Sequence, residues 1–269
     1  MSELLFLSHP SYFTIPSWQD ENGLVVAGIT TKNGGVSQAP LESFNQALHV
    51  HDNPVDVIAN RRLLAEQLAF PLETWVIGQQ THGTGIKRVN QQDMGAGAYS
   101  QETAVTGVDG LITDVKHVLL AAHYADCTPL FFYDPEGERI GIAHAGWKGT
   151  VKGMAREMVH AFQEAGTDVE NVRVAIGPAI SARHYHVDRN VVDQVADHFR
   201  GHVVSQVSET HYQLDLKSLN KLYCLEAGVP EDRIEMTSLC TYEQSDLFYS
   251  HRRDDGGTGR MLGFIGMSR

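Results

Sequence analysis

The sequence lacks any apolar stretch approaching the roughly 20 residues that span a bilayer, so we expect no transmembrane helix. Its first ten residues have neither a basic segment nor a small-residue cleavage site, and we expect no secretory signal peptide. Basic residues are also few: 21 Lys and Arg stand against 33 Asp and Glu, giving a net charge of −12. Such a surface repels phosphate backbones and anionic lipids, so neither nucleic acid nor a membrane is the expected partner.

Cysteine is scarce as well, because only Cys127, Cys224 and Cys240 occur, without paired spacing. This usage is typical of a reducing cytoplasm and not of a disulfide framework, so we expect a cytoplasmic protein. Internal repeats, low-complexity runs and Pro- or Ser-rich linkers are also missing. We therefore predict a single domain over residues 1–269, as a monomer or homodimer.

Apolar periodicity and turn residues predict more strands than helices. Helices are expected over residues 54–68, 149–166, 191–199 and 216–223, with Asn53 and Asp188 as caps of the first and third. Strands are expected over 24–30, 74–78, 108–113, 117–124, 129–133, 139–144 and 172–176, and from Ile234, Leu247 and Met261. This order indicates a mixed sheet core covered by helices, in the α/β or α+β class.

Cys127 lies in the segment YADCTP, between two apolar strands. Pro129 disfavours helix for the residue before it and cannot donate a sheet hydrogen bond. The neighbouring Asp126 is costly to bury without a partner. A thiol in this position can be a nucleophile, a metal ligand or a structural residue, and the segment alone does not decide.

The segment IAHAGWKGT at 142–150 is typical of a strand, a glycine turn and a helix start. His144 ends the strand, where reactive side chains of sheet enzymes often lie. Gly146 lets the backbone approach a ligand closely, and Lys148 adds charge beside free N–H groups. The segment is a candidate phosphate site, although a plain tight turn with a surface lysine has the same pattern.

His82 lies in the segment QQTHGT, directly after a predicted strand. A single loop histidine is usually structural, but Cys127 and His144 flank one hairpin, and His82 needs only one neighbouring strand to join them. One thiolate and two imidazoles form a zinc site with a vacant fourth position, the pattern of catalytic zinc. A metal there polarises a bound water or substrate oxygen. These three residues are the predicted metal ligands and catalytic residues.

The segment SHRRDDGGTGR at 250–260 joins three arginines, including Arg252 and Arg260, to a glycine-rich turn. Guanidinium groups match phosphate and carboxylate oxygens. A surface hairpin with paired charges has a similar pattern, so the segment is a candidate anion site with that alternative open.

Together these segments resemble one family: the purine nucleoside phosphorylases once described as multicopper polyphenol oxidases, or laccase-domain proteins. The matching motifs are TTKNGGVS at 30–37, FN at 44–45, Asp52, NRR at 60–62, QTHG at 80–83, DGL at 109–111, ADCTP at 125–129, HAGWKG at 144–149, IGP at 176–178 and residues 252–260. Three departures from the family pattern are Lys32, the stretch HYHV at 184–187 and Glu243, and they bear on substrate range.

The resemblance implies a layered αββα sandwich of mixed sheets in the α+β class, similar to cysteine-hydrolase toxin domains. It implies zinc on His82, Cys127 and His144. Copper is an alternative or adventitious metal there, because Cu(II) binds such ligands more tightly. The implied activity is phosphorolysis of adenosine, inosine and methylthioadenosine, with adenosine deamination as a second activity. Candidate substrate-binding residues are then Lys148, Gly146, Asn45, Arg61, Arg252 and Arg260.

Other functions remain open from the sequence. A metal-free cysteine hydrolase would use Cys127 as nucleophile and His144 as base. A copper-dependent polyphenol oxidase needs several His-x-His pairs and a His-Cys-His motif, whereas the chain has such pairs only at 49–51 and 184–186. A non-enzymatic nucleotide-binding module would explain the glycine turn but not the three soft ligands.

Overall fold

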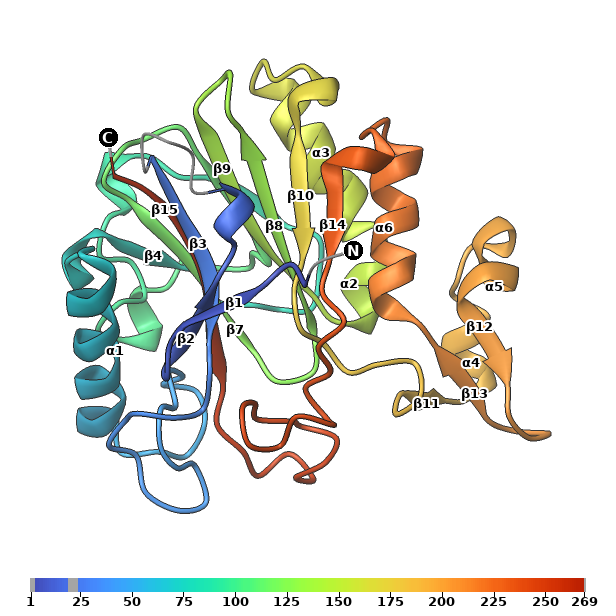
Figure 1. The fold of residues 1–269 in the computed structure, drawn as a ribbon, viewed down its shortest axis with the longest axis horizontal. Helices are drawn as coiled ribbons and strands as arrows, with labels where there is room; N and C mark the ends of the chain where they lie inside the picture. The colour runs from blue at the N-terminus through green and yellow to red at the C-terminus, as the bar shows by residue number, and fades with distance from the viewer. Residues whose placement is uncertain (1–2, 19–23, 269) are drawn as a thin grey trace.

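Two six-stranded sheets stacked face to face form the centre of the structure, a computed structural model that describes residues 3–18 and 24–268 (Figure 1). The first sheet has the order β1 (Phe6–His9), β2 (Tyr12–Thr14), β3 (Val25–Thr30), β15 (Met261–Met267), β7 (Leu119–Tyr124) and β4 (Trp75–Ile77). The second has the order β14 (Ile234–Met236), β10 (Arg173–Ile176), β8 (Thr128–Asp134), β9 (Arg139–Ala145), β6 (Gly110–Thr113) and β5 (Ile86–Arg88). Both sheets are mixed: β4–β7, β10–β14 and β5–β6 are parallel pairs, and the other pairs are antiparallel.

Alternation along the central strands divides the apolar side chains between the faces of each sheet. Leu120 and Tyr124 of β7 pack with Phe131 of β8 in the core between the two sheets. Leu119 and Ala121 of the same strand belong to a separate cluster on the outer face of the first sheet. Because both faces of β7 are buried, its sequence is a continuous apolar run up to His123.

Helices cover the two outer faces (Figure 1). Helix α1 (Pro54–Leu68) packs Leu64 against the first sheet, while α3 (Met154–Glu164) and α6 (Leu216–Glu226) share a cluster with the second sheet, beside the short α2 (Trp147–Val151). Asn53 caps α1 by accepting the N–H of Val55, as predicted. The α+β class and the αββα layering are therefore confirmed, and similarity to cysteine-hydrolase toxin domains stays a prediction.

Three predicted elements differ from the structure. The helix expected over 149–166 is divided into α2 and α3 because Gly153 adopts a φ of 83°, which a continuous right-handed helix does not allow. The helix expected over 191–199 is divided into α4 (Arg189–Val192) and α5 (Asp197–Val203), since Ala196 between them is extended. The strand expected from Leu247 is wrong: the N–H groups of Leu247 and Phe248 both bond to the carbonyl of Gln244 in a turn.

A small lobe beside the sandwich contains α4, α5 and an antiparallel sheet (Figure 1). Its strands have the order β11 (His186–Val187), β13 (Tyr212–Leu214) and β12 (Val204–Gln206). They are two or three residues long, too short for alternation to predict them.

We expect Phe131→Ala to lower the free energy of unfolding by about 3–5 kcal/mol, because the ring is fully buried between the sheets and its removal leaves a cavity. Phe6→Ala is the matched control: this ring on an edge strand is 64% exposed, and its loss should change the free energy by less than about 0.5 kcal/mol. Chemical denaturation followed by circular dichroism measures both. Similar losses in the two variants would contradict the assigned core.

Candidate functional site

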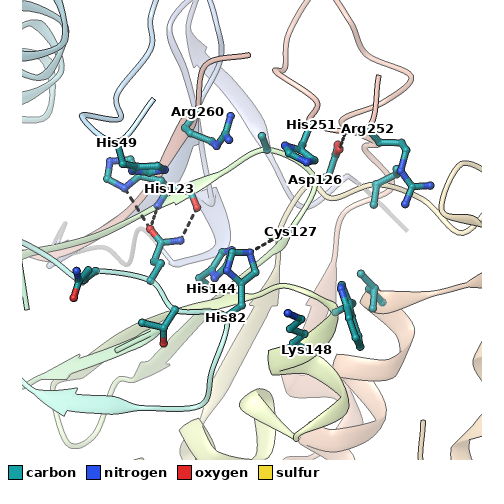
Figure 2. A pocket seen from close by; sticks show the side chains of 18 of the residues that line it. His49, His82, His123, Asp126, Cys127, His144, Lys148, His251, Arg252 and Arg260 are labelled. Atoms are coloured by element: carbon teal, nitrogen blue, oxygen red, sulfur yellow. Dashed lines mark hydrogen bonds between the residues drawn. The ribbon is translucent and has the colours of Figure 1, made fainter. Parts of the chain in front are cut away.

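His82, Cys127 and His144 meet in one cluster, which we call the ligand trio (Figure 2). His82 follows β4 of the first sheet, Cys127 lies in the turn from β7 to β8, and His144 lies in β9 of the second sheet. Their ligand atoms all lie within 4.8 Å of one another, and Cys127 Sγ is 4.0 Å from His82 Nε2. The trio therefore draws on both sheets, with Cys127 on the chain segment that crosses between them.

The donor set of the trio fits a metal ion. Zinc bonds to sulfur and imidazole nitrogen at about 2.0–2.3 Å, so ligand atoms around one tetrahedral ion lie about 3.3–3.8 Å apart. The ligand atoms of the trio lie within 4.8 Å of one another, and shifts of about 1 Å would bring them to that spacing. Within residues 3–18 and 24–268, no fourth His, Cys, Asp or Glu joins the group, so three residues would hold an ion here.

Asp109 organises the trio through hydrogen bonds at both carboxylate oxygens. Its Oδ1 accepts His144 Nδ1 at 2.8 Å and the backbone N–H of His82 at 3.0 Å. Its Oδ2 accepts the N–H groups of Thr81 and Gly83. Because His144 donates from Nδ1, its Nε2 is left to face the other two residues of the trio. From the sequence, Asp109 is recognised only as part of the DGL motif, and no role follows for it. The signal that could have identified it is a single carboxylate at the start of a buried strand.

Backbone strain surrounds the trio. His82 and Asp126 have positive φ values of 58° and 83°, in a region that L-residues rarely adopt. Asp126 is held by Thr241, Ser250 and the N–H of Arg252, all of which donate to its carboxylate. The predicted partner for the buried Asp126 is thus a set of three donors, and they fix the loop that carries Arg252.

Gly146 lies against the trio but does not line the cavity above it. A Cβ at this position would be 2.8 Å from His82 Cδ2 and 3.1 Å from Cys127 Sγ. Glycine therefore permits close packing of the β9–α2 turn on two of the ligands.

Cys127 and His144 form a charged pair. Burial opposes charge on both, but the His144 charge and hydrogen bonds from His144 and His82 lower the pKa of Cys127 to about 6. In return, the Cys127 thiolate and Asp109 raise the pKa of His144 to about 9 against the effect of burial. Although burial disfavours its charge too, hydrogen bonds from His144 and Gly83 lower the pKa of Asp109 to about 2. At neutral pH the metal-free site holds a thiolate and an imidazolium.

A second histidine pair lies beside the trio and has the opposite character. His49 and His123 meet edge to face with ring centroids 5.3 Å apart (Figure 2). Burial lowers the pKa of His49 to about 4, aided by the charges of Arg260 and Arg61. Burial and Arg61 likewise hold the pKa of His123 well below its usual value. Both rings are neutral donors and acceptors at physiological pH, and sequence reasoning did not assign either to the site.

A cavity of about 820 Å³ opens over the trio. Its lining includes three of the predicted substrate-binding residues, Lys148, Arg252 and Arg260. Arg61 and Asn45 lie behind the wall: Arg61 donates to the carbonyls of Gln46, Gly97 and Ala98, and Asn45 accepts the N–H of Arg260. Their positions support the wall and the Arg260 backbone, without a surface in the cavity.

Of the three departures from the family pattern, the stretch at 184–187 lies beside the cavity. Glu243 accepts His184 Nε2 at 2.9 Å, and the ring of His184 stacks on Tyr242. Tyr185, between the two histidines of that stretch, lines the cavity, whereas Lys32 borders a separate, smaller pocket. The departure at 184–186 is therefore adjacent to the cavity and the one at Lys32 is not.

Comparisons with known proteins find relatives along nearly the whole chain. The family described as multi-copper polyphenol oxidoreductase laccase matches residues 26–268. The protein named purine nucleoside phosphorylase YlmD of Bacillus subtilis is 46% identical over 97% of this chain and 96% of its own length. The protein of the same name from Geobacillus stearothermophilus is 49% identical over 90% of this chain and 89% of its own length.

Solved structures agree. The crystal structure of YlmD from Geobacillus stearothermophilus superposes with a TM-score of 0.94 at 43% identity, covering 100% of both chains. That of the Bacillus licheniformis hypothetical protein YfiH has a TM-score of 0.94 at 42% identity, covering 97% of this chain and 98% of its own. The arrangement of layers is thus shared with these proteins.

We expect Asp109→Asn to weaken zinc binding by about 10–100-fold, because an amide cannot accept all the hydrogen bonds that orient His82 and His144. Competition with a chromophoric chelator measures the affinity. Asp134→Asn is the matched control, since Asp134 is equally buried but lies at the far end of β8. Equal losses of affinity in both variants would show that Asp109 acts only through general stability.

The charged pair predicts an acidic reactivity profile for metal-free protein. Alkylation of Cys127 by iodoacetamide should be half-maximal near pH 6, since the thiolate persists down to its lowered pKa of about 6. Cys127→Ser gives the background, because Cys224 and Cys240 are buried. His144→Gln removes the cation and should move the midpoint to about 8.5 or above. An unchanged midpoint in that variant would contradict the pair.

Proposed function

Because the chain belongs to the multi-copper polyphenol oxidoreductase laccase family, whose relatives include proteins named purine nucleoside phosphorylase, we propose that it is a metal-dependent purine nucleoside phosphorylase. This membership confirms the resemblance that the motifs predicted. The proposed substrates are adenosine, inosine and methylthioadenosine with phosphate, and adenosine deamination is a proposed second activity. The proposed metal is zinc, held by the ligand trio.

The observation that carries this proposal is a set of three cations around the trio that have no carboxylate partner. Lys148, Arg252 and Arg260 line the cavity, and in the described part of the chain none has a carboxylate within 4.0 Å. Arg88 and Lys116, outside the cavity, are paired with carboxylates, whereas Lys152 and Arg233 are not among the described residues, so the cavity is distinguished by three such cations lining one space. In a chain of net charge −12, cations gathered around one cavity without carboxylate partners favour an anionic substrate.

The reaction places defined demands on these residues. In phosphorolysis a phosphate oxygen bonds to the ribose carbon as the bond from that carbon to the base breaks, and the departing base takes a proton. The positive charge around the cavity attracts phosphate and offsets its negative charge. A metal held by the ligand trio would supply a Lewis acid that polarises an oxygen or acidifies a water. Asp109 fixes the proton of His144 at Nδ1, so that this ring cannot turn away from the trio.

A metal-free cysteine hydrolase is the second candidate. In that enzyme Cys127 would be the nucleophile, His144 the base, and Asp109 the carboxylate that orients His144. His82, on the other side of the thiol, has no role in that chemistry. A polyphenol oxidase with several coppers is less well supported, since the described residues contain one such ligand cluster and copper can occupy it adventitiously.

The proposed location is the cytoplasm. All three cysteines are free thiols, as a reducing compartment favours. In residues 3–18 and 24–268 no helix combines the length and apolar composition that crossing a bilayer requires. A small soluble substrate is consistent with both observations.

We expect inosine to yield hypoxanthine and ribose 1-phosphate only when phosphate is present, and adenosine to release ammonia without it. Chromatography of nucleosides with and without phosphate separates the two activities. Cys127→Ser should lose both activities together with bound metal, of which about one zinc per chain is expected. Cys224→Ala is the matched control, a buried cysteine outside the cavity that should keep metal and activity.

Protein that released neither base nor ammonia under any metal loading would refute this proposal. Activity that survived complete removal of metal and depended on Cys127 would favour the hydrolase instead.

A further inference from the structure

The cavity has two ends, because its lining comes from two different sheets. At one end Gln80 follows β4, His123 belongs to β7, and Arg260 immediately precedes β15, all of the first sheet. At the other end Trp147 follows β9 and Ile180 follows β10 of the second sheet. The ligand trio lies between the two ends, where the chain crosses from sheet to sheet. Figure 2 shows His49 and His123 on the side of the trio away from Arg252 and Lys148.

The end at the first sheet is polar, and we call it the Arg260 end. Arg260 is largely buried, and its Nη1 donates to the carbonyls of Thr258 and Gly259. These bonds anchor one nitrogen and leave the rest of the guanidinium for the cavity. His49 and Gln80 add neutral polar groups beside it. A partly desolvated guanidinium without a carboxylate is stabilised by an anion that enters with its own oxygens.

The end at the second sheet is apolar, and we call it the Tyr185 end. Tyr185, Trp147, Ile180 and Leu216 contribute to its wall. The two cations at this end both lie over aromatic rings: Arg252 is 5.0 Å from the ring centroid of Tyr185, and Lys148 is 5.7 Å from that of Trp147. Each cation already interacts with an aromatic ring, so this end of the cavity presents flat aromatic surfaces with positive charge beside them. Such a wall suits a flat heterocycle better than a tetrahedral anion.

We propose that phosphate binds at the Arg260 end and the purine base at the Tyr185 end, with the ribose over the ligand trio. This assignment rests on the proposed function and adds a direction to it. Displacement at the ribose carbon requires the attacking oxygen and the departing base on opposite sides of that carbon. Ends separated by the trio meet this requirement, whereas three cations acting on one phosphate do not.

Tyr185 follows from this assignment as the residue on which the purine base stacks. It lies at the entry to the small lobe and is backed by Arg252, whose Nη1 donates to the carbonyl of His186. That bond fixes the guanidinium, and the guanidinium supports one face of the ring. The other face remains for stacking, which tolerates different purines because every purine presents a flat π-face.

Two binding measurements test the assignment on metal-loaded protein. Inorganic phosphate is titrated by calorimetry, and inosine is titrated by calorimetry as well, each in the absence of the other ligand. Arg260→Met should weaken phosphate binding by about 10-fold or more and change inosine binding little. Arg260→Lys serves as a second variant should the loop around Thr258 be disturbed. Tyr185→Leu should weaken inosine binding by about 10-fold, and Tyr185→Phe, which keeps the ring, should restore it.

Arg88→Met, an exposed arginine of β5 outside the cavity, controls for the loss of one positive charge. The Michaelis constants in phosphorolysis should divide in the same way, with that for phosphate raised by Arg260→Met and that for inosine by Tyr185→Leu. The reverse division, or failure of the unaltered protein to bind either ligand, would overturn the assignment. If Arg260→Met weakens only phosphate binding and Tyr185→Leu only inosine binding, but no hypoxanthine forms, the proposed function fails while the assignment of the two ends is supported.

Discussion

The buried carboxylate of Asp109 is the constraint on which the site depends. It accepts hydrogen bonds from the loop that carries His82 and from the ring of His144, so a single side chain sets two of the three ligands. The loop that Asp109 holds has His82 in a left-handed conformation, which would relax without those bonds. A buried charge is tolerated here because each of its oxygens has at least two donors.

Histidines in and near the cavity show how neighbours decide the sign of a pKa shift. Burial disfavours the charged form of His144, His49 and His123 alike. His144 faces a thiolate and a carboxylate, which overcome burial, while the other two face guanidinium groups, which add to it. The metal-free cavity therefore places a charged imidazole and neutral ones close together. Their different states follow from whether sulfur or arginine lies next to each ring.

Local signals predicted the parts of the fold that local interactions determine. Helix α1 was recognisable because Asn53 and Pro54 set its start through contacts within a few residues. The break between α2 and α3 at Gly153 was not recognisable. A glycine is compatible with the helical spacing of apolar residues around it, and only the folded structure shows its positive φ. The apolar run at Leu247 has the composition of a strand, but its backbone turns while Phe248 enters the core.

The same division applies to the site. The trio was predictable because a thiol and two imidazoles at strand ends have few structural uses. Asp109 was not assigned a role because its partners lie 26 to 35 positions away along the chain, and only sheet register brings them together. Arg61 lies in the NRR motif, but the carbonyls that it binds come from two other loops. The sequence therefore did not show that its side chain is buried behind the cavity wall. Tyr185 and His49 likewise reach the cavity through packing between segments.

The route of the chain through Cys127 also bears on mechanical stability. His82 extends from one sheet and His144 from the other, so an ion held by both residues would link the two sheets of the sandwich. Its binding free energy would add to the free energy needed to separate the sheets, in proportion to the logarithm of the ratio of free metal to the dissociation constant. Resistance to unfolding would then depend on how much metal the surroundings provide.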